Sequence, residues 1–379
     1  MSVTIQPVAI PDGVDIERAP NGKDRVSEEE LNFFDKKTVF YDLFTDPANE
    51  DALVGLGPPL LNLASRLDGM KLVIDGKKVP YKWRDHPELK LSVLKAKMPS
   101  RHSGHGARTV ELQFSDFSVS VSVGQREEQG RKVIAAISKD NKVPWISEWV
   151  DHYRENFDID DVFVYDNGSR NRGELKEALK GRAHVVDWDF PYGPPGKTHN
   201  KFAQAGALNH CLTRFARRGV LYNFDIDELL ISNKEAIASE LAGKGVVYFN
   251  SYNVPFVKPA CETYTHKDFY YRFPELKTTA RKFVCKEDKV DVISQHATWK
   301  RSSIFLGGRM RRNKPDTCVS PSSYFLHFLG ITTNWQPRLN KLEEVSTEGL
   351  VRDESHIHMM PGAQNGNTEG MAKGLVGEQ

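Results

Sequence analysis

Short apolar runs alternate with longer helical patterns in the middle of the chain. Four runs have the length and composition of buried strands, and they cover residues 132–140, 160–169, 183–190 and 220–231. The stretches between them space their apolar residues three and four apart, as a helix with one buried side does. Strands that alternate with helices of ten or more residues indicate βαβ units and a mostly parallel sheet. We therefore expect an α/β domain over residues 129–350.

The chain before this region has a different pattern. Between residues 31 and 128, stretches such as RTVELQF and FSVSVSVG alternate apolar and polar side chains with the period of a half-buried strand. An Asp-Gly pair within MKLVIDGKKVPYKW marks a hairpin turn. This segment predicts a small all-β accessory domain. Residues 1–30 and 351–379 are polar or glycine-rich, and we expect a flexible N-terminal arm and a flexible C-terminal tail.

Polar side chains gather where the predicted strands of the α/β domain end. In open α/β sheets, ligands bind at the carboxyl ends of the strands, so these side chains are expected to share one rim. The residues in question are Ser138, Asp140, Asp166, Asn167, Ser169, Asp225 and Asp227.

Three carboxylates interrupt the apolar run LYNFDIDELLI at residues 221–231. On a regular strand, Asp225 and Asp227 would point to one face and Glu228 would point away from them. Two adjacent carboxylates repel each other unless a cation lies between them, and oxygen ligands suit Mg²⁺ or Mn²⁺. The pair could instead cap the following helix or meet nearby arginines. An Asp-x-Asp pair alone does not decide between these interpretations.

Composition and charge narrow the class of protein. Hydrophobic residues make up 39% of the 379 positions, enough for packed cores. Lys and Arg number 52 against 51 Asp and Glu, so bulk charge gives no reason to expect nucleic-acid binding. The four cysteines form no CxxC pair, which argues against a zinc knuckle or a disulfide framework. No window approaches the ~18 apolar residues of a membrane span, so we expect a cytoplasmic protein whose membrane association, where it occurs, is peripheral and at the inner face.

Five segments follow one another from the α/β region onward. They read VPWISEWVDHYRENFDIDDVFVYDNGSRN, HNKFAQAGALNHCL, VLYNFDIDELLI, RKFVCKEDKVDVISQHATWK and YFLHFLGITTNWQPRLNK. This series resembles the GT-A nucleotide-sugar glycosyltransferases, especially glycosyltransferase family 92 and family 2-like bacterial enzymes. In those families, a helix with Glu-Trp precedes a strand ending in Asp-Asn-x-Ser, and a later strand ends in Asp-x-Asp-Glu. The resemblance implies a Rossmann-like GT-A fold for the α/β domain.

The resemblance also implies a metal site and a catalytic base. Asp225 and Asp227 would hold Mn²⁺ or Mg²⁺, with His296 favoured as a third ligand and His327 as a second candidate. An inverting enzyme needs one carboxylate as a base against the acceptor hydroxyl. The family tends to place an acid near Glu262, and Asp268 and Glu275 are alternatives.

Further residues are implied for the nucleotide-sugar donor. Asp166 resembles the residue that receives the uracil or ribose, although an Asx-type turn with no ligand would explain it equally well. The other donor-site candidates are Ser138, Asp140, Asn167 and Ser169 in the strand-end loops, Lys201 and Gln204 on the long helix, and Lys282 and Arg309 for the diphosphate.

The resulting hypothesis is a metal-dependent inverting glycosyltransferase. It would move a hexose from a nucleotide sugar, with UDP as the expected nucleotide, to a glycan or glycolipid in polysaccharide biosynthesis, and the β domain could join two copies of the chain. One alternative is a sugar nucleotidyltransferase, although SKDNKVPW lacks the glycine-rich loop that such enzymes carry after the first strand. Another is a carbohydrate-binding protein without enzymatic activity, which the predicted β domain would suit.

Overall fold

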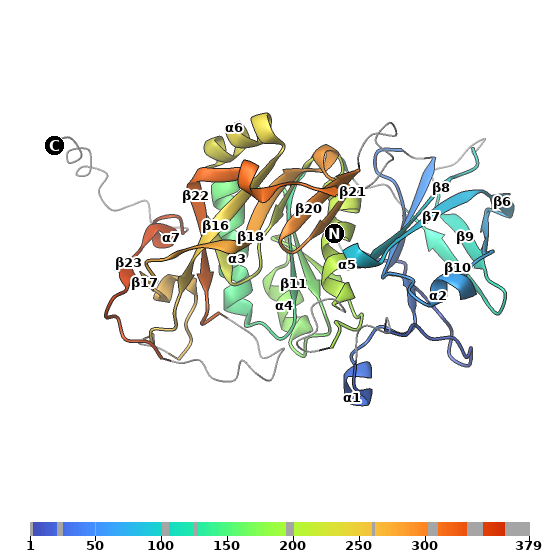
Figure 1. Cartoon of the computed structure of the whole chain (residues 1–379), viewed down its shortest axis with the longest axis horizontal. Helices are drawn as coiled ribbons and strands as arrows, with labels where there is room; N and C mark the ends of the chain where they lie inside the picture. The colour runs from blue at the N-terminus through green and yellow to red at the C-terminus, as the bar shows by residue number, and fades with distance from the viewer. Residues whose placement is uncertain are drawn as a thin grey trace.

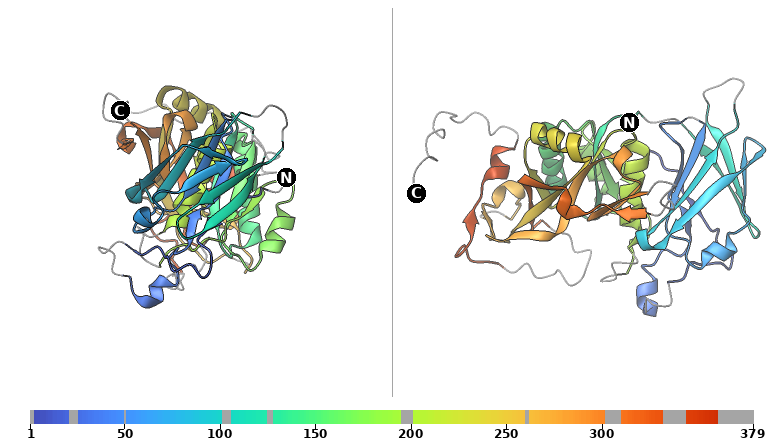
Figure 2. Two further views of the ribbon diagram at one scale, coloured as in Figure 1. Left: turned by 90° about the vertical axis from the view of Figure 1, so that its right-hand side faces the viewer. Right: turned by 45° about the horizontal axis from the view of Figure 1, so that its top comes forward.

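The computed structural model describes residues 3–20, 26–49, 51–100, 106–124, 128–194, 201–259, 262–301, 310–331 and 344–360. An N-terminal region of antiparallel strands lies beside a larger region in which helices pack on a central sheet (Figure 1). The C-terminal elements lie at the far end of the larger region from the N-terminal strands (Figures 1 and 2).

The central sheet has eight strands in the order β13-β12-β11-β14-β18-β16-β22-β15. The first four are parallel neighbours, as the sequence pattern predicts, but β18 pairs with β14 and β16 in antiparallel fashion, and so does β15 with β22. The sheet is therefore mixed rather than mostly parallel. Its strands are β11 (Lys132–Ser138), β12 (Asp161–Asp166), β13 (His184–Asp187), β14 (Val220–Asn223), β15 (Glu228–Ile231), β16 (Val246–Val254), β18 (Leu276–Lys286) and β22 (Val319–Phe328).

Helices cover both faces of this sheet because its strands are apolar on both sides. Along β11, Ile134 and Ala136 pack with α3, while Val133 and Ala135 pack with α5. Leu175 of α4 and Ile237 of α6 join the first of these two cores. The helices are α3 (Val143–Phe157), α4 (Arg172–Ala178), α5 (Phe202–His210) and α6 (Lys234–Lys244), and a π-helical turn (Cys211–Phe215) extends α5.

The N-terminal region forms two four-stranded antiparallel sheets around its own apolar core. One sheet has the order β3-β4-β8-β7 and the other β10-β9-β5-β6. Whether residues 31–128 are a separate domain stays a prediction. The elements are β1 (Val8–Ala9), α1 (Glu28–Leu31), β2 (Thr38–Phe40), β3 (Asp42–Thr45), β4 (Ala52–Gly57), α2 (Leu63–Arg66), β5 (Lys71–Ile74), β6 (Lys77–Val79), β7 (Tyr81–His86), β8 (Leu91–Lys97), β9 (Arg108–Gln113) and β10 (Ser118–Val123).

Short elements complete the structure. Strands β19 to β21 form a small antiparallel sheet, and β17 pairs with β23. Among the described residues, no helix is long and apolar enough to cross a membrane. The elements are a 3-10 turn (His266–Asp268), β17 (Tyr271–Arg272), β19 (Val292–Ser294), β20 (Ala297–Arg301), β21 (Met310–Arg312), β23 (Val351–Arg352) and α7 (Ser355–His358), with further 3-10 turns at Pro87–Leu89, Glu287–Lys289 and Pro315–Thr317.

A buried polar and aromatic contact joins the N-terminal region to the larger one. The Tyr41 ring packs against Trp188, and it lies so close to Gly206 that a Cβ there would come within 2.4 Å of it. Next to it, the Asp42 carboxylate accepts hydrogen bonds from His210 Nε2 at 2.8 Å and Arg214 Nη1 at 2.7 Å. Since a buried carboxylate needs such partners, these bonds fix how the two regions meet.

The described parts of both chain ends contact the rest of the protein. In the N-terminal arm, Val8 and Ile10 are buried in the core, and the buried Arg18 guanidinium donates to the backbone oxygens of Pro59 and Thr38. In the C-terminal tail, α7 buries His356, whose Nε2 bonds the His266 backbone oxygen at 3.0 Å. These side chains anchor the described parts of both segments, and the flexibility of residues 1–30 and 351–379 stays a prediction. Residues 361–379 lie outside the described residues.

The buried histidine His152 on α3 leads to a pH prediction. Burial lowers its pKa to about 3, while Nε2 bonds the Leu230 carbonyl oxygen at 3.0 Å. Below pH ~6.5, His152 binds a proton in the unfolded chain but stays neutral in the folded protein. The free energy of unfolding therefore falls by about 1.4 kcal/mol per pH unit as the pH drops from there toward 3. We expect His152→Leu to be less stable than the wild type at pH 7, with the difference about 2 kcal/mol smaller at pH 5.

Urea unfolding of both proteins at the two pH values measures this difference. His358→Leu removes an exposed histidine from α7 and serves as the control. If the difference in free energy of unfolding between the wild type and His152→Leu stays constant from pH 7 to pH 5, His152 does not cause the loss of stability at low pH.

Candidate active site

The acidic segment Asp225–Asp227 is a turn between two strands of the sheet. β14 ends at Asn223 and β15 begins at Glu228, and three other strands separate these two in the sheet. Glu228 N donates to Asp225 O at 3.1 Å, and Asp225 N donates to Glu228 Oε2 at 2.8 Å. The predicted single strand over residues 220–231 is therefore wrong, and so is the expectation that Glu228 points away. Its carboxylate folds back onto the turn.

A fully buried lysine balances two of these carboxylates. Lys282 Nζ lies 2.6 Å from Asp225 Oδ2 and 3.2 Å from Glu228 Oε2. Burial alone would raise the pKa of Asp225, but the charge of Lys282 outweighs it and holds the pKa below its usual range. Burial, together with the charges of Asp225 and Asp227, raises the pKa of Glu228 to about 7. We expected the Lys282 ammonium to contact the donor diphosphate. In this structure it pairs with Asp225 and Glu228 instead.

The structure brings His327, rather than His296, to the second aspartate. His327 Nε2 lies 3.3 Å from Asp227 Oδ2, and although burial alone would lower the pKa of His327, this bond raises it to about 9. His296 Nδ1 faces the Arg281 backbone oxygen at 3.3 Å, and burial, followed by the Lys282 charge, lowers its pKa to about 4. A role for His296 as a metal ligand stays a prediction.

Three side chains could hold a metal ion together. Ligand atoms of Asp227, Glu228 and His327 all lie within 4.8 Å of one another. Two carboxylates and an imidazole can bind Mn²⁺, and carboxylates also suit Mg²⁺. Because Asp227 and His327 keep side-chain exposures of 26% and 34%, while Glu228 keeps 6%, the first two are open to an ion from solvent.

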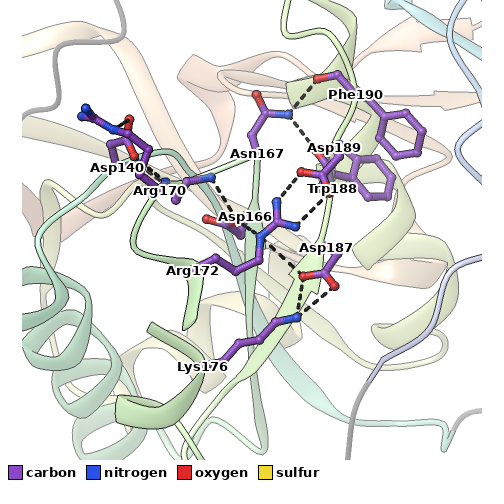
Figure 3. Close-up of polar contacts among 11 residues, drawn as sticks. Asp140, Asp166, Asn167, Arg170, Arg172, Lys176, Asp187, Trp188, Asp189 and Phe190 are labelled. Atoms are coloured by element: carbon purple, nitrogen blue, oxygen red, sulfur yellow. Dashed lines mark hydrogen bonds and ion pairs between the residues drawn. The ribbon is translucent and has the colours of Figure 1, made fainter. Parts of the chain in front are cut away.

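Arg172 gathers the acidic side chains at the ends of β12 and β13 (Figure 3). Its guanidinium bonds the buried Asp166 and the exposed Asp189, and it lies 3.7 Å from Asp187. These bonds raise the pKa of Arg172 above its usual range, with Asp189 as the largest contribution. Asp166 Oδ1 is buried and has no hydrogen-bond partner within the described part of the chain. One oxygen of Asp166 is therefore neutralised, and the other is a buried acceptor with no partner among the described residues.

Hydrogen bonds tie the neighbouring strand-end loops together (Figure 3). Asn167 Nδ2 donates to the backbone oxygens of Trp188 and Phe190, at 2.7 and 2.8 Å. The Ser169 hydroxyl accepts from Asp140 N at 2.8 Å, and the buried Ser138 hydroxyl accepts from Asn141. The polar groups of Ser138, Asn167 and Ser169 thus hold the loops in place. Their predicted contacts with a donor stay a prediction.

The two candidates near the start of α5 meet at Tyr192. Its hydroxyl donates to Gln204 Oε1 at 3.2 Å, and Lys201 Nζ lies 5.7 Å from its ring centroid. Burial raises the pKa of Tyr192, and the charge of Asp225 adds to this effect. Lys201 and Gln204 therefore both lie against Tyr192, and their predicted contacts with a donor stay a prediction. The predicted helix over residues 199–219 is shorter than expected, since α5 ends at His210 and a π-helical turn follows.

The structure does not favour Glu262 over Asp268, or the reverse, as the catalytic base. Glu262 is exposed to solvent. The Asp268 carboxylate accepts from Thr265 N at 2.7 Å and closes the capping box of its own 3-10 turn. Its assignment as the base stays a prediction, as does that of Glu262. Arg309, proposed for the diphosphate, lies outside the described residues.

Sequence reasoning missed Gln295 and Arg172. Gln295 Nε2 donates to Asp225 Oδ2 at 2.8 Å, and its backbone oxygen accepts from Asn223 at the end of β14. It precedes His296, so its position next to a candidate ligand was the available signal. Arg172 lies six residues after Asp166, at the first position of α4, where it can reach back to the strand end. A charged residue in the first turn after a strand-end loop was the signal there.

The comparison with protein families matches most of the larger region. The model of the family described as glycosyltransferase family 92 matches residues 136–359. This match contains the acidic turn, Lys282 and both histidines. No curated protein matched the sequence of this chain.

Solved structures gave weaker likenesses. Glucosyl-3-phosphoglycerate synthase from Mycobacterium tuberculosis, in complex with Mn²⁺, UDP-glucose and glycerol 3-phosphate, is 17% identical, with a TM-score of 0.27 over 42% of this chain and 58% of that chain. The same enzyme in complex with phosphoglyceric acid is 19% identical, with a TM-score of 0.24 over 33% of this chain and 44% of that chain. The match thus spans roughly half the length of those enzymes. TM-scores this low do not assign the chain to a family, so its family membership rests on the family model.

Proposed function

Since the chain belongs to glycosyltransferase family 92 and is a glycosyltransferase, we propose that the acidic turn and His327 form its metal and nucleotide-sugar site. The proposed reaction moves a hexose from a UDP-linked donor to a glycan or glycolipid, with inversion at the anomeric carbon. The observation that carries the proposal is the convergence of Asp227, Glu228 and His327 within 4.8 Å at the edge of the α/β sheet.

The proposed metal ligands are Asp227 and His327. A divalent cation bound there would neutralise the negative charge on the departing nucleoside diphosphate. Binding requires His327 to give up its proton, because a metal takes the lone pair of a neutral imidazole. The buried Glu228 lies beside them, and its raised pKa lets it adjust its charge when the cation arrives.

The proposed task of Lys282 is to keep Asp225 ionised and in place. With Lys282 and Gln295 both bonded to Asp225 Oδ2, that carboxylate has one oxygen fixed by the protein. Its side chain remains 27% exposed, and Oδ1 takes no part in these two bonds. We assign this oxygen to the donor rather than to a structural ion pair.

The proposed nucleoside contact is the free oxygen of Asp166. Oδ2 is bonded by Arg172, whereas Oδ1 has no partner among the described residues and could accept an N–H or O–H of the nucleoside. A buried acceptor without a partner costs about 1–3 kcal/mol, and a ligand that satisfies it recovers that energy on binding.

A nucleotide screen by thermal shift, with and without Mn²⁺, tests this proposal. We expect UDP to raise the melting temperature only when Mn²⁺ is present, because the proposed site binds the diphosphate through the metal. A ligand at 100 times its dissociation constant stabilises the native state by about 2.7 kcal/mol. Equal shifts in EDTA and in Mn²⁺ would argue against a metal-bridged diphosphate. Product analysis separates the reaction classes, because a glycosyltransferase releases a nucleoside diphosphate and a nucleotidyltransferase releases pyrophosphate.

A further inference from the structure

A buried glutamate and histidine lie directly behind the acidic turn. Glu148 is on α3, and His266 opens the 3-10 turn at His266–Asp268. Glu148 Oε2 accepts the His266 backbone N–H at 2.7 Å and lies 3.2 Å from the ring atom Nδ1. At the other end of the ring, Nε2 donates to the backbone oxygen of Ile226 at 2.8 Å. The imidazole therefore connects helix α3 to the peptide group between the two aspartates.

The geometry leaves this ring little freedom. The His266 side chain is fully buried, and Glu148 keeps a side-chain exposure of 13%. Burial alone would raise the pKa of Glu148, but the hydrogen bonds from His266 outweigh it, so the pKa lies below its usual range. An ionised carboxylate accepts hydrogen bonds strongly, and two bonds from the same residue fix both the backbone and the ring of His266.

The turn carrying His266 is itself fastened on two further sides. His356 Nε2 bonds the backbone oxygen of His266 at 3.0 Å. Thr265 and Asp268 close a capping box around the same turn. The carboxylate of Asp268 thus has a structural task in holding the turn of His266.

Helix α3 also holds the strand that follows the acidic turn. The Tyr153 hydroxyl donates to Glu228 O and accepts from Leu230 N, both at 3.1 Å. Within the turn, Ile226 O accepts from His266, as Asp225 O accepts from Glu228 N and Asp227 O from Phe328 N. A side chain that orients a ligand from behind is a common feature of metal sites.

We infer that Glu148 and His266 are positioning residues for the metal site. By holding Ile226 O, the pair fixes the plane of the peptide group that joins Ile226 to Asp227. The orientation of this peptide group in turn sets the directions of the Asp225 and Asp227 side chains. Neither residue reaches the substrate. This inference rests on the proposed function, because it assumes that the acidic turn binds a divalent cation.

Binding of Mn²⁺ alone, followed by electron paramagnetic resonance of the free ion, tests the inference. We expect His266→Leu to bind Mn²⁺ about 10- to 100-fold more weakly than the wild type, as replacements behind metal ligands do. His266→Gln keeps an N–H near the position of Nε2, and we expect it to recover most of the affinity. Glu148→Ala frees the ring and is expected to weaken binding in the same direction.

His210 offers a matched control in the other core of the larger region. It is also a fully buried histidine, with a carboxylate at Nε2 and the Tyr165 hydroxyl at Nδ1, both at 2.8 Å. We expect His210→Leu to lower the melting temperature and leave the Mn²⁺ affinity unchanged. An equal loss of Mn²⁺ affinity in His210→Leu would assign the effect to general destabilisation and overturn the inference.

The outcomes separate the inference from the proposed function. If Asp227→Ala loses Mn²⁺ binding while His266→Leu binds it as the wild type does, the function stands and the positioning role is wrong. If the wild type binds no Mn²⁺, both are wrong. If His266→Leu does not fold, Glu148→Ala and His266→Gln decide, and wild-type affinity in Glu148→Ala would overturn the positioning role.

Discussion

Replacing Asp227 by alanine is expected to lower kcat/KM for transfer from a UDP-hexose by about a thousandfold, which corresponds to about 4 kcal/mol of transition-state stabilisation. The reason is that the ligand atoms of Asp227, Glu228 and His327 converge within 4.8 Å, and the Asp227 carboxylate also contacts His327 Nε2 at 3.3 Å. Asp227→Asn keeps the shape of the side chain but removes the charge, and we expect a loss of similar size. Steady-state release of UDP measures both.

The control is a surface carboxylate that does not belong to the acidic turn. Asp288 is exposed and pairs with the neighbouring Lys289 at the surface. Asp288→Ala is expected to retain wild-type turnover. Near-normal activity in Asp227→Ala at saturating Mn²⁺ would remove Asp227 from the metal site.

Replacing Lys282 by methionine is expected to cost about 3–5 kcal/mol of stability in the metal-free protein, because the buried Glu228 and the partly buried Asp225 then lose their shared counter-charge. Lys282 is fully buried, and its pKa is raised because the charges of Asp225 and Glu228 outweigh burial. Mn²⁺ can replace part of the missing positive charge. We therefore expect Mn²⁺ to raise the melting temperature of Lys282→Met by more than it raises that of the wild type.

Melting curves in EDTA and in Mn²⁺ measure this difference. Lys244→Met removes a partly exposed lysine that pairs with Glu240 on α6, and it serves as the control with little effect under either condition. If Lys282→Met melts with the wild type in EDTA, the buried ion pairs do not contribute as the structure indicates.

The central α/β arrangement was predictable because its signal is local. Residues 132–140 and 160–169 are apolar on both faces, and this pattern occurs only where helices cover both sides of a strand. The antiparallel partners of the sheet were not predictable in the same way. β18 and β22 are long strands of mixed polarity, and their place in the sheet depends on contacts with residues far away in the sequence.

The acidic turn shows where a period-of-two pattern fails. Reading residues 220–231 as one strand placed Glu228 opposite the aspartates, but a turn at Asp225–Asp227 resets the alternation. It brings the Glu228 carboxylate back to Asp225 N and next to Asp227. Nothing in the local sequence marks this break, since it contains neither Gly nor Pro. Lys282, which compensates the charge, comes from a strand more than fifty residues later.

The choice between the two histidines also depended on the tertiary structure. His296 and His327 both come after the acidic segment in sequence, and both precede or lie within aromatic segments. The antiparallel pairing of β15 with β22 places Glu228 opposite His327, so strand register decides which ring reaches Asp227. The role of α3 was similarly hidden, because Glu148 acts through His266, 118 residues away.

The most direct test of the central claim is the release of UDP from UDP-hexose by the wild-type chain, measured in Mn²⁺ and in EDTA and compared with Asp227→Ala. The account predicts UDP release in Mn²⁺, its loss in EDTA, and its near-complete loss in the variant under both conditions. Release that proceeds equally in EDTA, or that survives in Asp227→Ala, would contradict a metal-dependent site at the acidic turn.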